Sequence, residues 1–183
     1  MNINAFSKTY TVRKLKESDI KDIYLLCKGN PQYYVHYPME LSVSSIQEDL
    51  KALPPGITPD RKHYIGYYDA HEVLIAMMDL IDGYPIPDTV FIGFFMCDNS
   101  VQGHGIQGHG IGSKIITELI QNLQNKGYRT VQLAWITTDT HAEHFWKKNG
   151  FIPIQETKST DGYSVLLAER SLHETSVQEL NEL

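Results

Sequence analysis

The sequence feature that most constrains this fold is a glycine-rich turn between a hydrophobic strand and an amphipathic helix. The turn is Gln107-Gly108-His109-Gly110-Ile111-Gly112-Ser113. The segment before it, Val90 to Cys97, is apolar at both alternating positions, which is typical of a central strand. The segment after it, about Ile111 to Lys126, carries its apolar residues on one helical face and meets Gly127 at its end. A strand, a crossover helix and a second strand in this order predict a parallel strand pair.

The start of this helix is a candidate anion-binding site. The first N–H groups of a helix have no intrahelical partner, and the helix dipole adds positive potential at the same place. The turn is not a Walker loop, because no Gly-Lys-Ser/Thr closes it. Gly103 to Gly108 fits G-x-G-x-x-G, but the acidic residue expected about 20 positions later is missing. A purely structural connection between strand and helix remains an alternative for the turn alone.

Two segments resemble motifs of the GNAT superfamily of N-acetyltransferases. Gln107-x-x-Gly110-x-Gly112 is similar to the Q/R-x-x-G-x-G/A loop that grips the pyrophosphate of acetyl-coenzyme A. Ala142 to Phe151 resembles the family's A-x-x-F/L-Y-x-x-x-G-F helix and turn, and the resemblance covers about Glu72 to Phe151. It implies an α/β fold with a central mixed, mostly antiparallel sheet of about seven strands and helices on both faces. It also implies an enzyme, an N-acetyltransferase with acetyl-CoA as acetyl donor.

The remaining elements follow from hydrophobic periodicity and capping signals. We expect helices after Ser18, from the capping box Ser45-x-x-Glu48, and from a second box Thr140-x-x-Glu143 to about Asn149. The expected strands are Thr9 to Arg13, His63 to Tyr68, Val73 to Ile81, Thr130 to Ile136, Ile152 to Thr157 and Tyr163 to Ala168. Residues 1–170 are predicted to form a single domain, followed by a polar tail over residues 171–183.

The resemblance also assigns cofactor-binding residues. In the family the central strand and the next strand separate, and the pantetheine arm of the cofactor pairs with the gap. The cofactor is therefore expected to contact the following residues: Phe95, Met96, Cys97, Gln107, Gly108, His109, Gly110, Ile111, Gly112, Ser113, Asp139 and Trp146. Within this set, the backbone N–H of Met96 is expected to polarise the thioester carbonyl as an oxyanion donor.

The acceptor amine needs a proton acceptor, because an alkyl amine with a pKa of about 10.4 is mostly protonated at neutral pH. The central strand carries no carboxylate. Asp79, flanked by apolar residues near the end of the preceding strand, is the predicted catalytic base, directly or through a water molecule. Asp82 and Asp88 are alternatives, and both fit equally well as solvated turn residues.

The chain departs from the family pattern at two places. Trp146 stands where the family has a tyrosine acid, and an indole N–H cannot deliver a proton. A thiol with a pKa near 8.5 can leave as the thiolate, so direct transfer without an acetyl-enzyme at Cys97 is still expected.

The second departure is a tandem repeat in the glycine-rich turn, where Gln102 to Ile106 is repeated at once as Gln107 to Ile111. Connection to the preceding strand favours the first copy as the pyrophosphate site, and continuity with the helix favours the second. We expect the second copy to bind, because the unpaired N–H groups belong to the helix start.

Composition restricts the other possibilities. A formal net charge of −6 argues against non-specific nucleic-acid binding. No apolar run approaches the roughly 20 residues of a membrane helix, and the first residues lack the pattern of a signal peptide. Only two cysteines are present, both in apolar segments, which favours a reducing, cytoplasmic location. His104, His109, His141 and His144 lack a third metal ligand at suitable spacing, so no metal is expected.

The sequence does not identify the acceptor. A small-molecule amine and a peptide amine are both compatible with it, and edge-strand pairing would permit a homodimer. The aromatic segment Tyr33 to Pro38 is interpreted either as core packing or as a wall of the acceptor pocket. A non-catalytic module that binds coenzyme A as a sensor or scaffold is the main alternative function, and nucleotide binding through the same loop is another.

Overall fold

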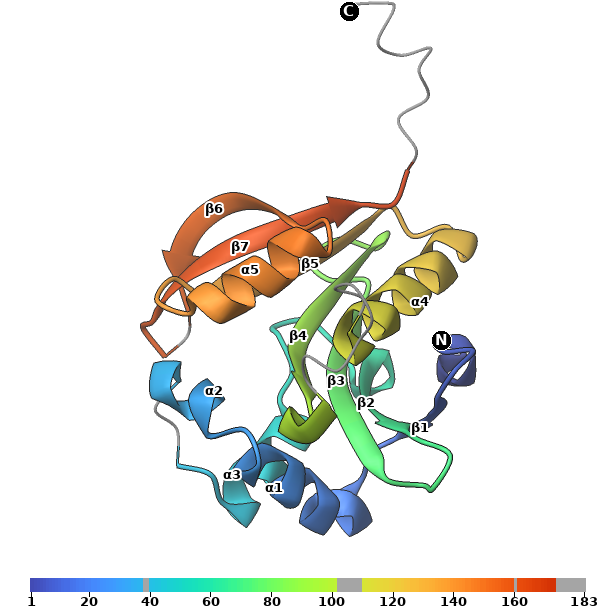
Figure 1. The fold of residues 1–183 in the computed structure, drawn as a ribbon. Coiled ribbons are helices and arrows are strands. Elements are labelled where there is room, and N and C mark those ends of the chain that lie inside the picture. Colours follow the sequence, from blue (N-terminus) through green and yellow to red (C-terminus); the bar gives the residue numbers. More distant parts are fainter. Residues whose placement is uncertain (38–39, 102–109, 160, 174–183) are drawn as a thin grey trace, which may run out of the picture.

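A seven-stranded sheet forms the centre of the protein (Figure 1). The computed structural model describes residues 1–183 except 38–39, 102–109, 160 and 174–183. The strands lie in the order β1-β2-β3-β4-β5-β7-β6, and every neighbouring pair is antiparallel except β4 and β5. This confirms the predicted mixed, mostly antiparallel sheet. The strand bounds are β1 Thr11–Lys14, β2 Lys62–Tyr68, β3 Leu74–Asp82, β4 Thr89–Cys97, β5 Thr130–Ile136, β6 Ile152–Lys158 and β7 Ser164–Ser171.

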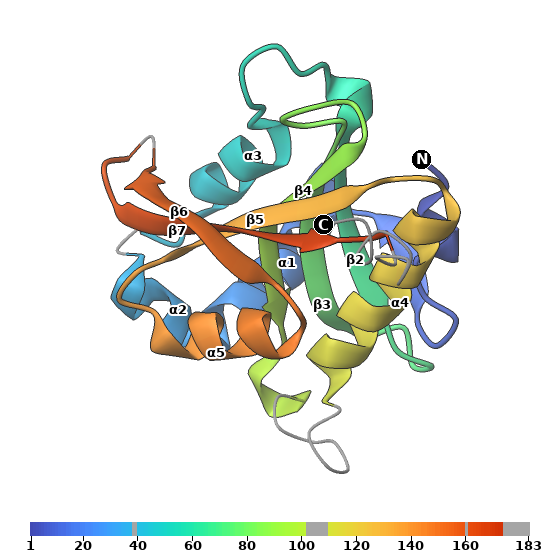
Figure 2. The ribbon, with the colours of Figure 1, turned by 90° about the horizontal axis from the view of Figure 1, so that it is seen from above.

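Helices cover both faces of the sheet, as predicted. They are α1 Ile20–Lys28, α2 Pro31–His36, α3 Val43–Lys51, α4 Ile111–Asn125 and α5 Thr140–Lys148. The apolar faces of α4 and α5 pack into one core cluster, whereas α1 and α3 pack into a second cluster on the opposite face. Figure 2 shows α4 and α5 on one side of the sheet and α3 on the other. Alternate residues of β4 divide between the clusters, with Phe95 and Cys97 facing α4 and α5, and Phe94 and Met96 facing α1 and α3.

The capping residues of three predicted helices differ from the sequence-based expectation. The helix expected from Ser45 begins at Val43, because Ser42 and Ser45 form the capping box with each other. The cap of α5 is Asp139, whose Oδ1 accepts a hydrogen bond from the N–H of Ala142 at 2.9 Å. Ser18 lies within the 3₁₀ turn η2 (Glu17–Asp19) and does not cap α1.

Two further segments differ from the sequence-based expectation. The aromatic segment after α1 lies outside the helices expected from the sequence, but Pro31–His36 forms the short helix α2, which begins with proline. The strand β7 extends to Ser171, and Leu172 is buried in the core and donates its N–H to the carbonyl of Arg129. The packed part of the chain therefore continues past residue 170.

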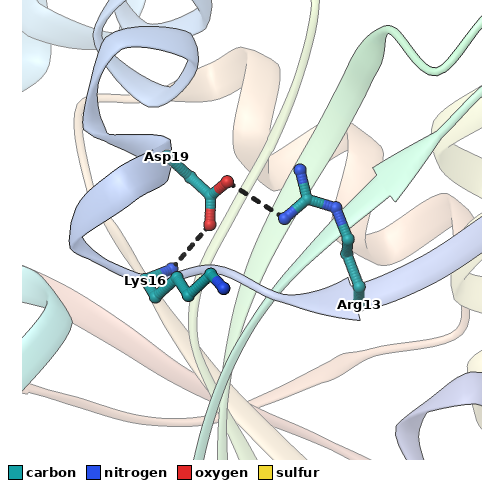
Figure 3. A network of polar contacts seen from close by, with 3 residues as sticks. All are labelled: Arg13, Lys16 and Asp19. Atoms are coloured by element: carbon teal, nitrogen blue, oxygen red, sulfur yellow. Dashed lines mark hydrogen bonds and ion pairs between the residues drawn. The ribbon is translucent and has the colours of Figure 1, made fainter.

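The start of α1 is fixed to the sheet by the carboxylate of Asp19 (Figure 3). Its Oδ2 accepts the backbone N–H of Lys16 at 2.9 Å, and its Oδ1 contacts the guanidinium of Arg13 at 3.0 Å. Arg13 lies over the ring of Tyr68, 4.1 Å from its centre. Because Arg13 belongs to β1 and Tyr68 to β2, this network joins the sheet to the helix whose apolar face lines one of the cavities described below.

Candidate functional site

The sheet splits between β4 and β5. These strands pair in parallel from Thr89↔Thr130 to Ile92↔Leu133, although β4 continues to Cys97 and β5 to Ile136. Beyond this point β4 stays paired with β3, and β5 stays paired with β7. The split begins at Gly93, where the register between β3 and β4 also shifts by one residue. A bulge of this kind bends a strand away from its neighbour.

A cavity of about 870 Å³ occupies the split. Its walls come from the separated ends of β4 and β5, the first turn of α4 and one face of α5. Nine of the predicted cofactor-binding residues line it, namely Phe95, Met96, Cys97, Gly110, Ile111, Gly112, Ser113, Asp139 and Trp146. The other three, Gln107, Gly108 and His109, lie outside the described residues. The fold therefore brings together residues from three separate segments that the sequence analysis assigned to one site.

The first turn of α4 opens into this cavity. Gly110 is the N-cap, in an extended conformation, and the first helical hydrogen bond runs from Lys114 N–H to its carbonyl. The N–H groups of Ile111, Gly112 and Ser113 precede that bond, as expected at a helix start. No heavy atom of the described residues would lie within 4 Å of a Cβ on Gly110, so these residues leave space at the N-cap. The helix start therefore offers both donors and space to an anion.

Gly112 has a different role, because it lets three elements approach closely. A Cβ at this position would lie 3.2 Å from the ring of Phe145 and 3.3 Å from the Sγ of Cys97. Ser113 adds a polar link between the same helices, since its Oγ accepts from the side-chain amide of Asn149 at 3.2 Å. The start of α4 is thus held against both α5 and β4.

Trp146 lies in an aromatic cluster on the wall of the cavity. It is buried, and its ring centre lies 5.9 Å from that of Phe95, 5.0 Å from Phe145 and 5.2 Å from Phe151. His144, two residues earlier on α5, is exposed and also lines the cavity. The cluster makes Trp146 a packing residue at this wall.

Of the three candidate carboxylates, Asp79 lines a cavity on the α1 side of the sheet, which is described below. Its Oδ2 forms an ion pair with the Nζ of Lys62 at 2.6 Å, and both side chains are largely buried. Its Oδ1 is buried without a hydrogen-bond partner in the described part of the chain. Burial raises the pKa of Asp79, and the neighbouring charge of Lys62 works in the opposite direction. Asp82 accepts a hydrogen bond from the Tyr128 hydroxyl, and Asp88 lies 3.6 Å from Arg129.

A second cavity, of about 230 Å³, lies beside the first on the face covered by α1, α2 and α3. Asp79 lines it together with Asp49 and Tyr64. Tyr33, Tyr37, Gly93 and Phe94 line both cavities, so the two spaces meet at the bulge in β4. The sequence analysis considered the aromatic segment as a pocket wall, but nothing in the sequence pattern indicated Asp49 or the partner of Asp79.

The helix α2 is tied to the far end of the sheet across these cavities. The hydroxyl of Tyr37 donates to Asp161 at 2.9 Å, and its ring packs against that of Tyr163 with centres 5.2 Å apart. His36 Nδ1 and Thr138 Oγ1 are 3.2 Å apart. These contacts place the aromatic residues of α2 over the junction of the two cavities.

The described residues contain neither a helix that could span a membrane nor a group of side chains that could hold a metal ion. Among them, no helix combines the length and apolar character needed to cross a membrane. Within the same ranges, no three His, Cys, Asp or Glu side chains are grouped closely enough to hold a metal ion.

Comparison with known proteins identifies the family. The model of the acetyltransferase (GNAT) family matches residues 19–151, and the chain belongs to this family. A comparison with curated protein sequences finds no match.

Solved structures of this family share the fold over nearly the whole chain. An acetyltransferase from Thermus thermophilus has a TM-score of 0.70 at 18% identity, with 89% of this chain and 97% of that chain covered. Spermidine N-acetyltransferase from Vibrio cholerae, in complex with CoA and spermine, has a TM-score of 0.65 at 17% identity, covering 91% and 97%. The ribosomal-protein-S18-alanine N-acetyltransferase of Escherichia coli has a TM-score of 0.62 at 14% identity, covering 92% and 97%.

The buried pair of Lys62 and Asp79 generates a stability prediction. Lys62→Met removes the cation and leaves a buried carboxylate without its partner, which is expected to lower the free energy of unfolding by about 3 kcal/mol. In the double variant Lys62→Met/Asp79→Asn, the loss should be smaller than the sum of the two single losses by at least about 1 kcal/mol. Urea denaturation followed by circular dichroism measures all three variants.

The control for this prediction is Lys147→Met, which removes a partly exposed ion pair to Glu143 on α5. That variant should lose only about 0.5 kcal/mol or less. A Lys62→Met protein as stable as the wild type would show that the pair contributes nothing to the fold.

Proposed function

We propose that this protein is an N-acetyltransferase that transfers the acetyl group of acetyl-CoA directly to an amine. The observation that carries this proposal is the cavity between the separated ends of β4 and β5, which begins at the first turn of α4. The structure in complex with CoA and spermine, from a protein of the same fold, supports acetyl-CoA as the donor. When bound, the cofactor supplies an activated acetyl thioester.

The diphosphate of the cofactor is assigned to the start of α4. The N–H groups of Ile111, Gly112 and Ser113 and the helix dipole favour an anion, and the space at Gly110 admits it. Asp139 is expected to act on this site indirectly, because its carboxylate is occupied by capping α5.

The register of β4 moves the proposed oxyanion donor from Met96 to Phe95. Met96 lies opposite Met77, and Asp98 donates its N–H to the carbonyl of Ile75. In an antiparallel pair, hydrogen-bonded positions alternate, so this bond places Met96 and Met77 in a hydrogen-bonded pair. The N–H of Met96 therefore points to β3. The N–H of Phe95 points to the opposite edge, which faces the cavity, and we assign the polarisation of the thioester carbonyl to that group.

Asp79 is proposed to accept the proton of the incoming ammonium group. Its Oδ1 is the carboxylate oxygen that Lys62 leaves without a partner in the described part of the chain, and Asp79 lines the second cavity beside Gly93, which lines both cavities. The deprotonated amine then forms the amide bond while the carbon–sulfur bond of the thioester breaks. The second proton of the nitrogen passes to the departing thiolate, and the proton held by Asp79 is released to solvent, so the reaction needs no other reactant.

The residues near the thiolate fit direct transfer. Trp146 provides packing but no proton, and a thiol of ordinary pKa leaves without one. Cys97 is a poor nucleophile, because burial raises the pKa of its thiol to about 12. An acetyl-enzyme at Cys97 is therefore not part of the proposal.

The buried indole at the family's tyrosine position also suits the alternative, a module that binds coenzyme A without catalysis. Thiol release from acetyl-CoA in the presence of a panel of primary amines separates the two functions, with the acetylated product identified by mass spectrometry. We expect amine-dependent release that continues over many turnovers. Tight binding of acetyl-CoA without release for any amine would favour the non-catalytic module.

The proposed diphosphate site is tested by a matched pair of substitutions at Gly110. Asp and Asn are both good N-caps and fit the extended backbone and open space at this position, so both variants should fold. Gly110→Asp places a negative charge beside the diphosphate and should weaken acetyl-CoA binding at least about tenfold by calorimetry. Gly110→Asn, which has the same shape without the charge, is the control. Equal affinities for the two variants would place the diphosphate elsewhere.

A further inference from the structure

The second cavity has the chemistry of a site for an organic cation. No Lys, Arg or His is among the described residues that line it, whereas Asp49 and Asp79 both do. Lys62, which does not line the cavity, forms an ion pair with Asp79, so the net charge of the cavity wall is that of Asp49. Asp49 is an exposed residue of α3, and it forms no hydrogen bond or ion pair within the described part of the chain. An anionic ligand would meet no counter-charge in this space.

Aromatic rings form much of the remaining wall. Tyr33 packs edge-to-face against Tyr34 at 5.2 Å and against Phe94 at 5.4 Å, and Tyr64 lies on the strand side. Burial raises the pKa of each of these tyrosines and of Tyr37, the last to about 12, so all of them are neutral at physiological pH. Neutral aromatic faces attract ammonium groups and pack against alkyl chains.

The two carboxylates stand at different depths of this cavity. Asp79 is buried beside Gly93 and Phe94, at the junction with the proposed cofactor cavity, whereas Asp49 is exposed. Burial raises the pKa of Asp49, the charge of Lys62 opposes this shift, and the negative charge of Asp79 adds to it. One elongated ligand with a positive charge at each end would match this arrangement.

We propose that the acceptor is a small aliphatic diamine, whose reacting amine lies at Asp79 and whose second ammonium group pairs with Asp49. This inference rests on the proposed function, because it names the acceptor class of the same enzyme. The volume of about 230 Å³ suits a short alkyl chain. Amino acids are disfavoured, since their carboxylate would face Asp49 and Asp79 with only the already paired Lys62 nearby.

The experiment measures equilibrium binding, so that it does not depend on catalysis. Calorimetry with protein saturated with CoA compares 1,4-diaminobutane with butylamine, which has the same chain but one charge. We expect the wild type to bind the diamine at least about tenfold more tightly, and Asp49→Asn to reduce that ratio to about one. Glu48→Gln, a charge change at the neighbouring exposed residue of α3 that does not line the cavity, should keep the wild-type ratio.

Steady-state thiol release with the same two amines and with glycine then separates the two proposals. Preferred binding of the diamine without acetylation would support the cation site and contradict the proposed function. Acetylation of butylamine or glycine as efficiently as of the diamine would support the enzyme and overturn the diamine proposal. Acetylation of a lysine-containing peptide but not of free diamines would overturn it as well.

Discussion

The separation of β4 from β5 is the constraint on which the rest of this structure depends. Each strand keeps its other neighbour, β3 or β7, so the sheet opens without losing either half. Opening leaves a strand edge that faces a cavity, and backbone groups at such an edge need hydrogen-bond partners. An extended ligand with amide groups satisfies this requirement in the way a further strand would. The start of α4, held against β4 and α5 at Gly112, adds the anion site at one end of the same cavity.

The bulge at Gly93 connects this donor site to the acceptor side. It adjoins the pair of Phe94 with Asp79, and a Cβ there would be 3.1 Å from the Asp79 Oδ2. The same residue lines both cavities, so the absence of a side chain keeps the carboxylate next to the passage between them. Lys62 adds to this arrangement, because it pairs with Oδ2, the carboxylate oxygen nearest Gly93, and leaves Oδ1 without a partner in the described part of the chain. Proton transfer and acyl transfer are thus assigned to the two sides of one strand.

Local signals in the sequence predicted the strands, every helix except α2, and several residues that line the larger cavity. Hydrophobic periodicity and the glycine turn located β4 and α4, and the motif at Ala142 located the aromatic wall around Trp146. Local signals could not predict contacts between segments that are distant in the sequence. The pairing of Lys62 with Asp79 depends on the β2–β3 register. The direction of the Met96 N–H depends on which alternate residues of β3 and β4 form hydrogen-bonded pairs. Helix starts were missed where several residues compete as caps, as Ser42 and Ser45 do in α3.

Amide hydrogen exchange at Phe95, followed by NMR with and without acetyl-CoA, tests the central claim most directly. Met96 is an internal reference, because its N–H is directed to β3 whether or not the cofactor is bound. The account predicts that saturating acetyl-CoA slows exchange at Phe95 by at least about tenfold and shifts the amide signals of Ile111 to Ser113, while Met96 changes little. Saturation of the protein with acetyl-CoA without protection at Phe95 would contradict the assignment of the cofactor to the split between β4 and β5.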